Sequence, residues 1–76
     1  MHNLYLINNP ENPKSFEFVW THLIQILDMK PIQAEQCCLI AQERGRAHLK
    51  QGNIVDLLSL QASLEAEGIT IELTEQ

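Results

Sequence analysis

The chain has 76 residues, of which 45% are hydrophobic, and it carries a formal net charge of −5. A chain of this length predicts one domain, over residues 1–76, whose small core leaves little room for an interior cofactor cavity, so that a site is expected to be shallow and near the surface. The negative charge argues against nucleic-acid binding, because contacts to phosphates need clustered Lys and Arg side chains.

No stretch of the sequence is long and apolar enough to span a membrane, and no signal-peptide pattern follows Met1. Cys37 and Cys38 are adjacent, so they cannot bridge each other within a regular helix without distortion. A secreted domain held by disulfides would space its cysteines differently. These features predict a cytoplasmic protein that binds neither nucleic acid nor a membrane.

The first part of the sequence predicts a strand followed by a helix. Residues 3–7 form a short apolar run that ends at the turn signal Asn-Asn-Pro of residues 8–10. Ser15 is a good N-cap, and apolar residues then recur at helical spacing to about Asp28. Trp20 lies on the apolar side of this helix, which favours a place in or beside the core over a role as a binding anchor.

The middle of the sequence predicts a second helix and a second strand. Pro31 is tolerated in the first turn of a helix, and Gly45 is a typical helix end. Residues 46–50 then alternate between charged and apolar side chains, as in a half-buried strand. Gln51 and Gly52 predict a turn after this strand.

The last third predicts a third helix and a closing strand. Asn53 resembles the N-cap of a capping box, with Asp56 in place of the usual Glu. The helix is expected to run to about Glu67 and to end at Gly68, and residues 69–73 alternate as a strand. The order β-α-α-β-α-β predicts an α+β domain with a three-stranded, mostly antiparallel sheet and helices on one face. Six residues are expected to be mostly buried: Leu6, Phe18, Leu23, Leu39, Leu57 and Ile71.

Motifs for catalysis or metal binding are missing from the sequence. The three histidines fall in three different predicted elements, and no Cys and His spacing typical of zinc occurs. The three glycines stand at turns and form no phosphate-binding loop. Cys37 and Cys38 are read as two small apolar residues in a helix, since buried free Cys behaves as a small hydrophobe. We expect a protein that is not an enzyme and needs no cofactor or metal.

One face of the second predicted strand is basic and carries Arg46, His48 and Lys50. Two interpretations stay open. Charges on a strand can simply discourage edge-to-edge aggregation. Alternatively, these three residues contact an acidic partner protein.

Several segments together match one known family. The first strand ends Leu-Ile-Asn-Asn at 6–9, Glu-Phe-Val follows at 17–19, and Gly-Arg-Ala closes the second helix at 45–47. In these features the sequence resembles the ClpS family, the adaptor domain of the Clp protease that recognises N-degrons. The resemblance covers nearly the whole chain. A more distant similarity in fold to the C-terminal domain of the ribosomal stalk protein is the alternative.

The resemblance implies a ligand site at the end of the first strand. In the family, an Asn, an Asp and a His hold the α-amino group of the substrate, and apolar residues of two helices line a pocket for its bulky first side chain. The matching positions here are Asn8, Asn9, Phe16, Cys38 and Gln42. Asn9 replaces the family Asp and Gln42 replaces the His, so the usual carboxylate and imidazole are missing. Glu11, in a turn lengthened by Asn12 and Pro13, is the candidate that restores a negative charge.

Two functions follow from the resemblance. The first is a ClpS-like adaptor, a peptide-binding module that presents a peptide or protein N-terminus to a Clp-type ATPase and protease, with altered pocket chemistry. The second is an interaction domain of the same fold that has lost amine recognition and binds only a protein partner, such as the N-domain of a Clp-type ATPase. Binding of peptides that differ only in their first residue separates the two.

Overall fold

The computed structural model describes residues 1–11 and 14–75, which fold in the order β-α-α-β-α-β. Asn12 and Pro13, expected to lengthen the turn after the first strand, lie outside the described residues. The elements are β1 His2–Ile7, α1 Phe16–Leu27, α2 Pro31–Arg44, β2 Arg46–Gly52, α3 Ile54–Ala66 and β3 Ile71–Glu75. In the sheet, β1 lies between β2 and β3 and pairs antiparallel with both. The predicted α+β class and element order are confirmed.

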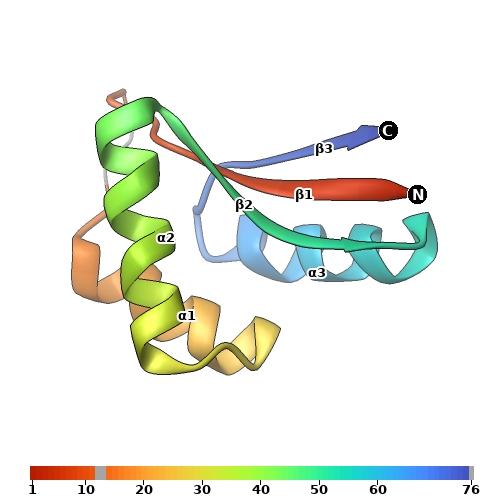
Figure 1. The fold of residues 1–76 in the computed structure, drawn as a ribbon, viewed down its shortest axis with the longest axis horizontal. Helices are drawn as coiled ribbons and strands as arrows, with labels where there is room; N and C mark the ends of the chain where they lie inside the picture. The colour runs from red at the N-terminus through yellow and green to blue at the C-terminus, as the bar shows by residue number, and fades with distance from the viewer. Residues whose placement is uncertain (12–13, 76) are drawn as a thin grey trace.

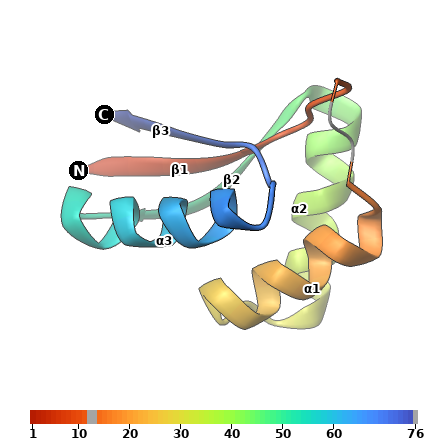
Figure 2. The same cartoon turned by 180° about the vertical axis from the view of Figure 1, so that it is seen from behind.

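The three helices lie on one side of the sheet (Figure 1). α3 runs along the sheet and contacts all three strands, α2 packs mainly on β2, and α1 packs on α2 and α3. In the reverse view α3 lies in front of β2, and no helix of the described residues lies on the other side of the sheet (Figure 2). None of the helices in the described ranges has the length and apolar character that a bilayer crossing requires.

Side chains and glycines predicted from the sequence set the helix ends. The Ser15 hydroxyl accepts a hydrogen bond of 3.1 Å from the Phe18 amide at the start of α1. The Asn53 side chain accepts one of 3.0 Å from the Asp56 amide at the start of α3. Gly45 ends α2 with a φ of 91°, a left-handed conformation that glycine adopts without steric cost. These caps satisfy backbone groups that a helix leaves without internal partners.

The core lies between the sheet and the helices. The alternation predicted for β2 is confirmed, since Ala47 and Leu49 are buried while Arg46, His48 and Lys50 are exposed. The four largest side chains that are fully buried come from β1, α1 and α3, namely Leu4, Leu23, Leu57 and Leu64.

The predicted core is largely correct, with one error. Leu6, Leu23, Leu57 and Ile71 are buried, and Phe18 packs half-buried against the core. Leu39 was expected to be buried but is 41% exposed. The buried positions of α2 are Ala34, Cys37, Cys38 and Ala41. Since successive residues of an α-helix are about 100° apart around its axis, the position after Cys38 turns away from the core.

Two strand boundaries differ from the prediction. Gln51 and Gly52 were expected to form a turn, but they continue β2 and pair with Asn3 and His2. Because β1 begins at His2, its pairing with β2 extends β2 beyond the alternating residues 46–50. The closing strand was expected at 69–73 and is observed at Ile71–Glu75, so that residues 69–70 lie in the turn that leads into it.

Candidate functional site

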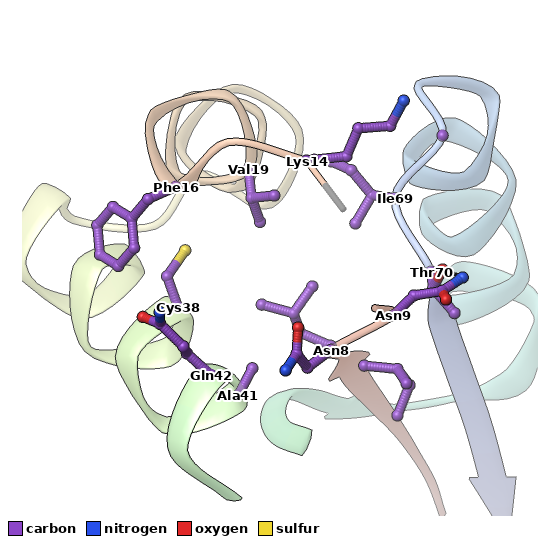
Figure 3. Close-up of a pocket in the computed structure, with 13 residues that line it drawn as sticks. Asn8, Asn9, Lys14, Phe16, Val19, Cys38, Ala41, Gln42, Ile69 and Thr70 are labelled. Atoms are coloured by element: carbon purple, nitrogen blue, oxygen red, sulfur yellow. Dashed lines mark hydrogen bonds between the residues drawn. The ribbon is translucent and has the colours of Figure 1, made fainter. Parts of the chain in front are cut away.

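A cleft of about 240 Å³ opens at the end of β1, between the start of α1, the middle of α2 and the turn from α3 to β3 (Figure 3). Five of the six residues that the resemblance implies for the ligand site lie in its walls: Asn8, Asn9, Phe16, Cys38 and Gln42. The sixth, Glu11, is exposed and is not part of the lining. Segments distant in the sequence therefore meet at the predicted position.

Backbone hydrogen bonds hold the walls of the cleft together at the end of β1. The Asn8 amide donates to the Gly45 carbonyl at 2.9 Å, which fixes this end of the strand beside the end of α2. The Ile7 amide donates to the Thr70 carbonyl at 3.0 Å, which fixes it beside the turn into β3. Asn8 is thus held between two parts of the fold, and its side chain points into the cleft (Figure 3).

Much of the cleft wall is apolar. The apolar lining residues come from β1, α1, α2 and the turn before β3. They are Leu6, Ile7, Phe16, Val19, Ala41 and Ile69. The Cys38 side chain joins them. Burial, and secondarily the neighbouring Cys37, raises the pKa of the Cys38 thiol to about 11. The thiol is therefore neutral at pH 7 and acts as a small apolar side chain.

The polar groups of the cleft fall into two kinds. The Asn9 amide is part of the structure, since its nitrogen donates to the Thr70 hydroxyl at 3.1 Å and its oxygen accepts from the Glu11 backbone amide at 3.1 Å. Within the described ranges, the side-chain amides of Asn8 and Gln42 have no hydrogen-bond partner. Asn8 and Gln42 therefore offer donors and acceptors to a ligand.

The charge in the cleft differs from the expectation based on Glu11. Glu11 contributes its backbone amide to Asn9, and its carboxylate does not line the cleft. Among the lining residues that the structure describes, the single charged side chain is that of Lys14. This one charge is positive, on a protein whose net charge is −5.

The sequence reasoning missed several lining residues, including Lys14, Val19, Ile69 and Thr70. Val19 faces the cleft from α1, one turn after Phe16, and could have been found from helical spacing. Residues 69–70 directly precede a strand that pairs with β1. If β1 had been predicted as the central strand of the sheet, residues 69–70 would have been expected beside the end of β1.

Two basic residues of β2, Arg46 and His48, take part in contacts on the helix-free face of the sheet. The Arg46 guanidinium lies 3.9 Å from the centroid of the Tyr5 ring. Its Nη1 is 3.2 Å from Oε1 of Glu72, an ion pair without the alignment of a hydrogen bond. His48 stacks edge-on against Tyr5 with ring centroids 5.3 Å apart, and its Nε2 is 3.0 Å from Oδ1 of the buried Asn3. We call these five residues the Tyr5 cluster.

Lys50, the third residue of the predicted basic face, is exposed farther along β2, where it pairs with Leu4 across the ladder. It is not part of the Tyr5 cluster. The structure therefore brings together two of the three residues expected to contact a partner, and it surrounds those two with side chains of the same chain.

In the part of the chain that the structure describes, no group of three or more His, Cys, Asp or Glu side chains could hold a metal ion. No protein-family model matches the chain, and no curated protein matches it.

Proposed function

We propose that the protein is a peptide-binding adaptor module whose cleft takes the bulky apolar first side chain of a peptide or protein N-terminus. The observation that carries the proposal is the cleft itself, with apolar walls and two side-chain amides, Asn8 and Gln42, without partners in the described ranges. Ligand sites commonly combine apolar walls with a few polar groups that fix orientation. The volume of about 240 Å³ is below the roughly 300–1,000 Å³ of pockets for drug-sized molecules, and it suits a single large side chain.

The amides of Asn8 and Gln42 suit the polar end of such a ligand. An α-ammonium group has three N–H donors, and both side chains carry an acceptor oxygen. Neutral acceptors make weaker bonds to an ammonium group than a carboxylate does. The amine is therefore expected to add to the affinity, while the apolar side chain supplies the larger part.

The resemblance to the ClpS family extends this proposal to a cellular role. The module would act in the cytoplasm and present its ligand to the N-domain of a Clp-type ATPase. The exposed basic residues of β2, Arg46, His48 and Lys50, are the candidates for that contact.

A second function has an observation in its favour. The described lining of the cleft contains no carboxylate, and its single charge is the cation of Lys14. A site of this kind is less suited to an ammonium group than one with a carboxylate. The chain would then bind an apolar side chain of a partner protein without reading an amine.

Peptide titrations test the two functions. Short labelled peptides that differ only in the first residue, Phe, Leu or Ala, are titrated with the protein and followed by fluorescence anisotropy. We expect Phe and Leu peptides to bind and the Ala peptide to bind at least tenfold more weakly, because loss of a buried large apolar side chain costs on the order of 1.5–3 kcal/mol. The absence of binding for all three would overturn the proposal.

An acetylated Phe peptide is the control for the amine. Acetylation removes the positive charge and two of the N–H donors while it keeps the side chain. Weaker binding of the acetylated peptide supports amine recognition. Equal binding favours the second function, in which the cleft reads only the apolar side chain.

A further inference from the structure

Lys14 gives the cleft a chemical preference that the proposed function does not include. Figure 3 shows its side chain at the edge of the cleft opposite Gln42, with the ammonium group directed away from the floor. Polar groups of different kinds therefore occupy the two sides of the cleft. The unpaired amides of Gln42 and Asn8 lie on α2 and at the end of β1, and the cation of Lys14 lies beside Gly68 in the turn from α3 to β3.

The Lys14 side chain lies against Gly68 at this edge. A Cβ atom at position 68 would lie 2.7 Å from Cε and 2.9 Å from Nζ of Lys14, so the lysine stem passes directly over the glycine. Gly68 has a φ of 82°, in the left-handed region that glycine adopts freely. The same residue thus turns the chain after α3 and makes room for the lysine.

The charge of Lys14 is not neutralised within the described residues. The ion pairs found there involve other side chains, and the contact that Lys14 makes is with the Phe18 ring, whose centroid is 5.8 Å from Nζ. Glu67, the acid nearest to Gly68 in sequence, lies 3.4 Å from His22. An ammonium group that lies beside an apolar cleft and lacks a carboxylate is complementary to an anionic group of a ligand.

We infer that the cleft selects peptides with an acidic residue directly after the apolar first residue, whose carboxylate pairs with Lys14. This inference rests on the proposed function, since it assumes that the first side chain occupies the cleft. The ligand would then place its amine near Asn8 and Gln42 and its carboxylate on the opposite side, at Lys14. A Lys or Arg in the second position would be disfavoured for the same reason.

The test compares two free-amine peptides, Phe-Glu and Phe-Gln at positions one and two, with an identical remainder. At low salt, we expect the Glu peptide to bind about two- to fivefold more tightly, the range of an exposed ion pair. The preference should shrink as salt rises, because exposed charges are screened. The Lys14→Gln variant should bind both peptides equally.

Lys30→Gln is the matched control. Lys30 is exposed before α2 and lies outside the cleft lining, so this variant loses the same charge and should keep the preference for Glu. Equal binding of the two peptides by the wild type, or a preference that survives Lys14→Gln, would overturn the inference and leave the proposed function standing. If neither peptide binds, the proposed function fails and the inference fails with it.

Discussion

The cleft and the Tyr5 cluster both contain polar side chains, but the polar groups of the two regions differ in the contacts that they make. In the Tyr5 cluster, Arg46 and His48 already contact Tyr5, Glu72 and Asn3. In the cleft, the amides of Asn8 and Gln42 have no partner within the described residues. A ligand that binds groups already paired must replace existing contacts, whereas unpaired groups at a surface exchange only water. The comparison predicts that the cluster contributes to stability and the cleft to peptide binding.

The largest effect is expected from Tyr5→Ala. The substitution removes a half-buried ring on the central strand, together with the surface on which Arg46 and His48 pack. Truncation of a fully buried aromatic side chain to Ala lowers the free energy of unfolding by roughly 3–5 kcal/mol. Because the Tyr5 ring is only half-buried, we expect a smaller loss, of about 2 kcal/mol. Urea unfolding measures it. A loss below about 0.5 kcal/mol, the range of ordinary surface substitutions, would remove the distinction between the two regions.

Two glycine substitutions sharpen the comparison. Gly45→Ala and Gly68→Ala should each lower the free energy of unfolding by about 1–2 kcal/mol, because both residues have a positive φ. A Cβ at Gly45 meets nothing within 4 Å, whereas one at Gly68 meets the flexible end of Lys14. We therefore expect similar losses of stability, but a loss of the preference for acidic peptides only in Gly68→Ala.

A peptide preference that is unchanged in Gly68→Ala would show that the position of Lys14 does not depend on the glycine. Gly45→Ala serves as the control here, since it has the same backbone cost and leaves the lysine in place. Both variants are compared by urea unfolding and by titration with the Glu and Gln peptides.

Removal of the unpaired amides should affect binding and spare the fold. Asn8→Ala and Gln42→Ala each delete one hydrogen-bonding side chain from the cleft, which is expected to weaken peptide binding about fivefold, or on the order of 1 kcal/mol. Stability should change by less than about 0.5 kcal/mol, since neither amide has a partner in the described residues. Gln36→Ala, at an exposed position of α2 outside the cleft, is the control. Equal affinities for all three variants would argue against a ligand at these amides.

The smallest effect on stability near neutral pH is expected from the thiols of Cys37 and Cys38. Burial raises the pKa of Cys38 from 9.0 to about 11, and it also raises that of Cys37. The folded state therefore keeps protons that the unfolded state loses above pH 9, so these thiols should lower the stability as pH rises from 9 to about 11. Below pH 9 their contribution is constant. Urea unfolding between pH 9 and 11 measures the effect, and a Cys37→Ala, Cys38→Ala double variant separates it from other titrating groups. An equal slope of the free energy of unfolding against pH in both proteins would contradict the prediction.

The order of the elements could be predicted because local signals agree with the fold. Ser15, Asn53 and Gly45 mark helix ends that the structure retains. The errors in the predicted elements concern strand boundaries, which depend on pairing between residues distant in the sequence. Gln51 looked like a turn residue, but it pairs with Asn3 across the sheet.

The predicted site residues came from the resemblance, and the structure places five of them in one cleft. The charge of that cleft could not be predicted from it. Lys14 lies against Gly68, which is more than fifty residues away in the sequence, and Glu11 contributes its backbone amide to Asn9. Both depend on how the turn from α3 to β3 meets the end of β1, which no local pattern describes.

The central claim is that a peptide binds in the cleft and not on the Tyr5 cluster. The most direct test is a ¹H–¹⁵N NMR titration of the labelled protein with a peptide that begins with Phe. We expect shifts of the backbone amides of Asn8, Cys38 and Ile69 and of the side-chain amides of Asn8 and Gln42. The backbone amides of Tyr5 and His48 should shift little. Shifts confined to the Tyr5 cluster, or no shifts at saturating peptide, would contradict the account.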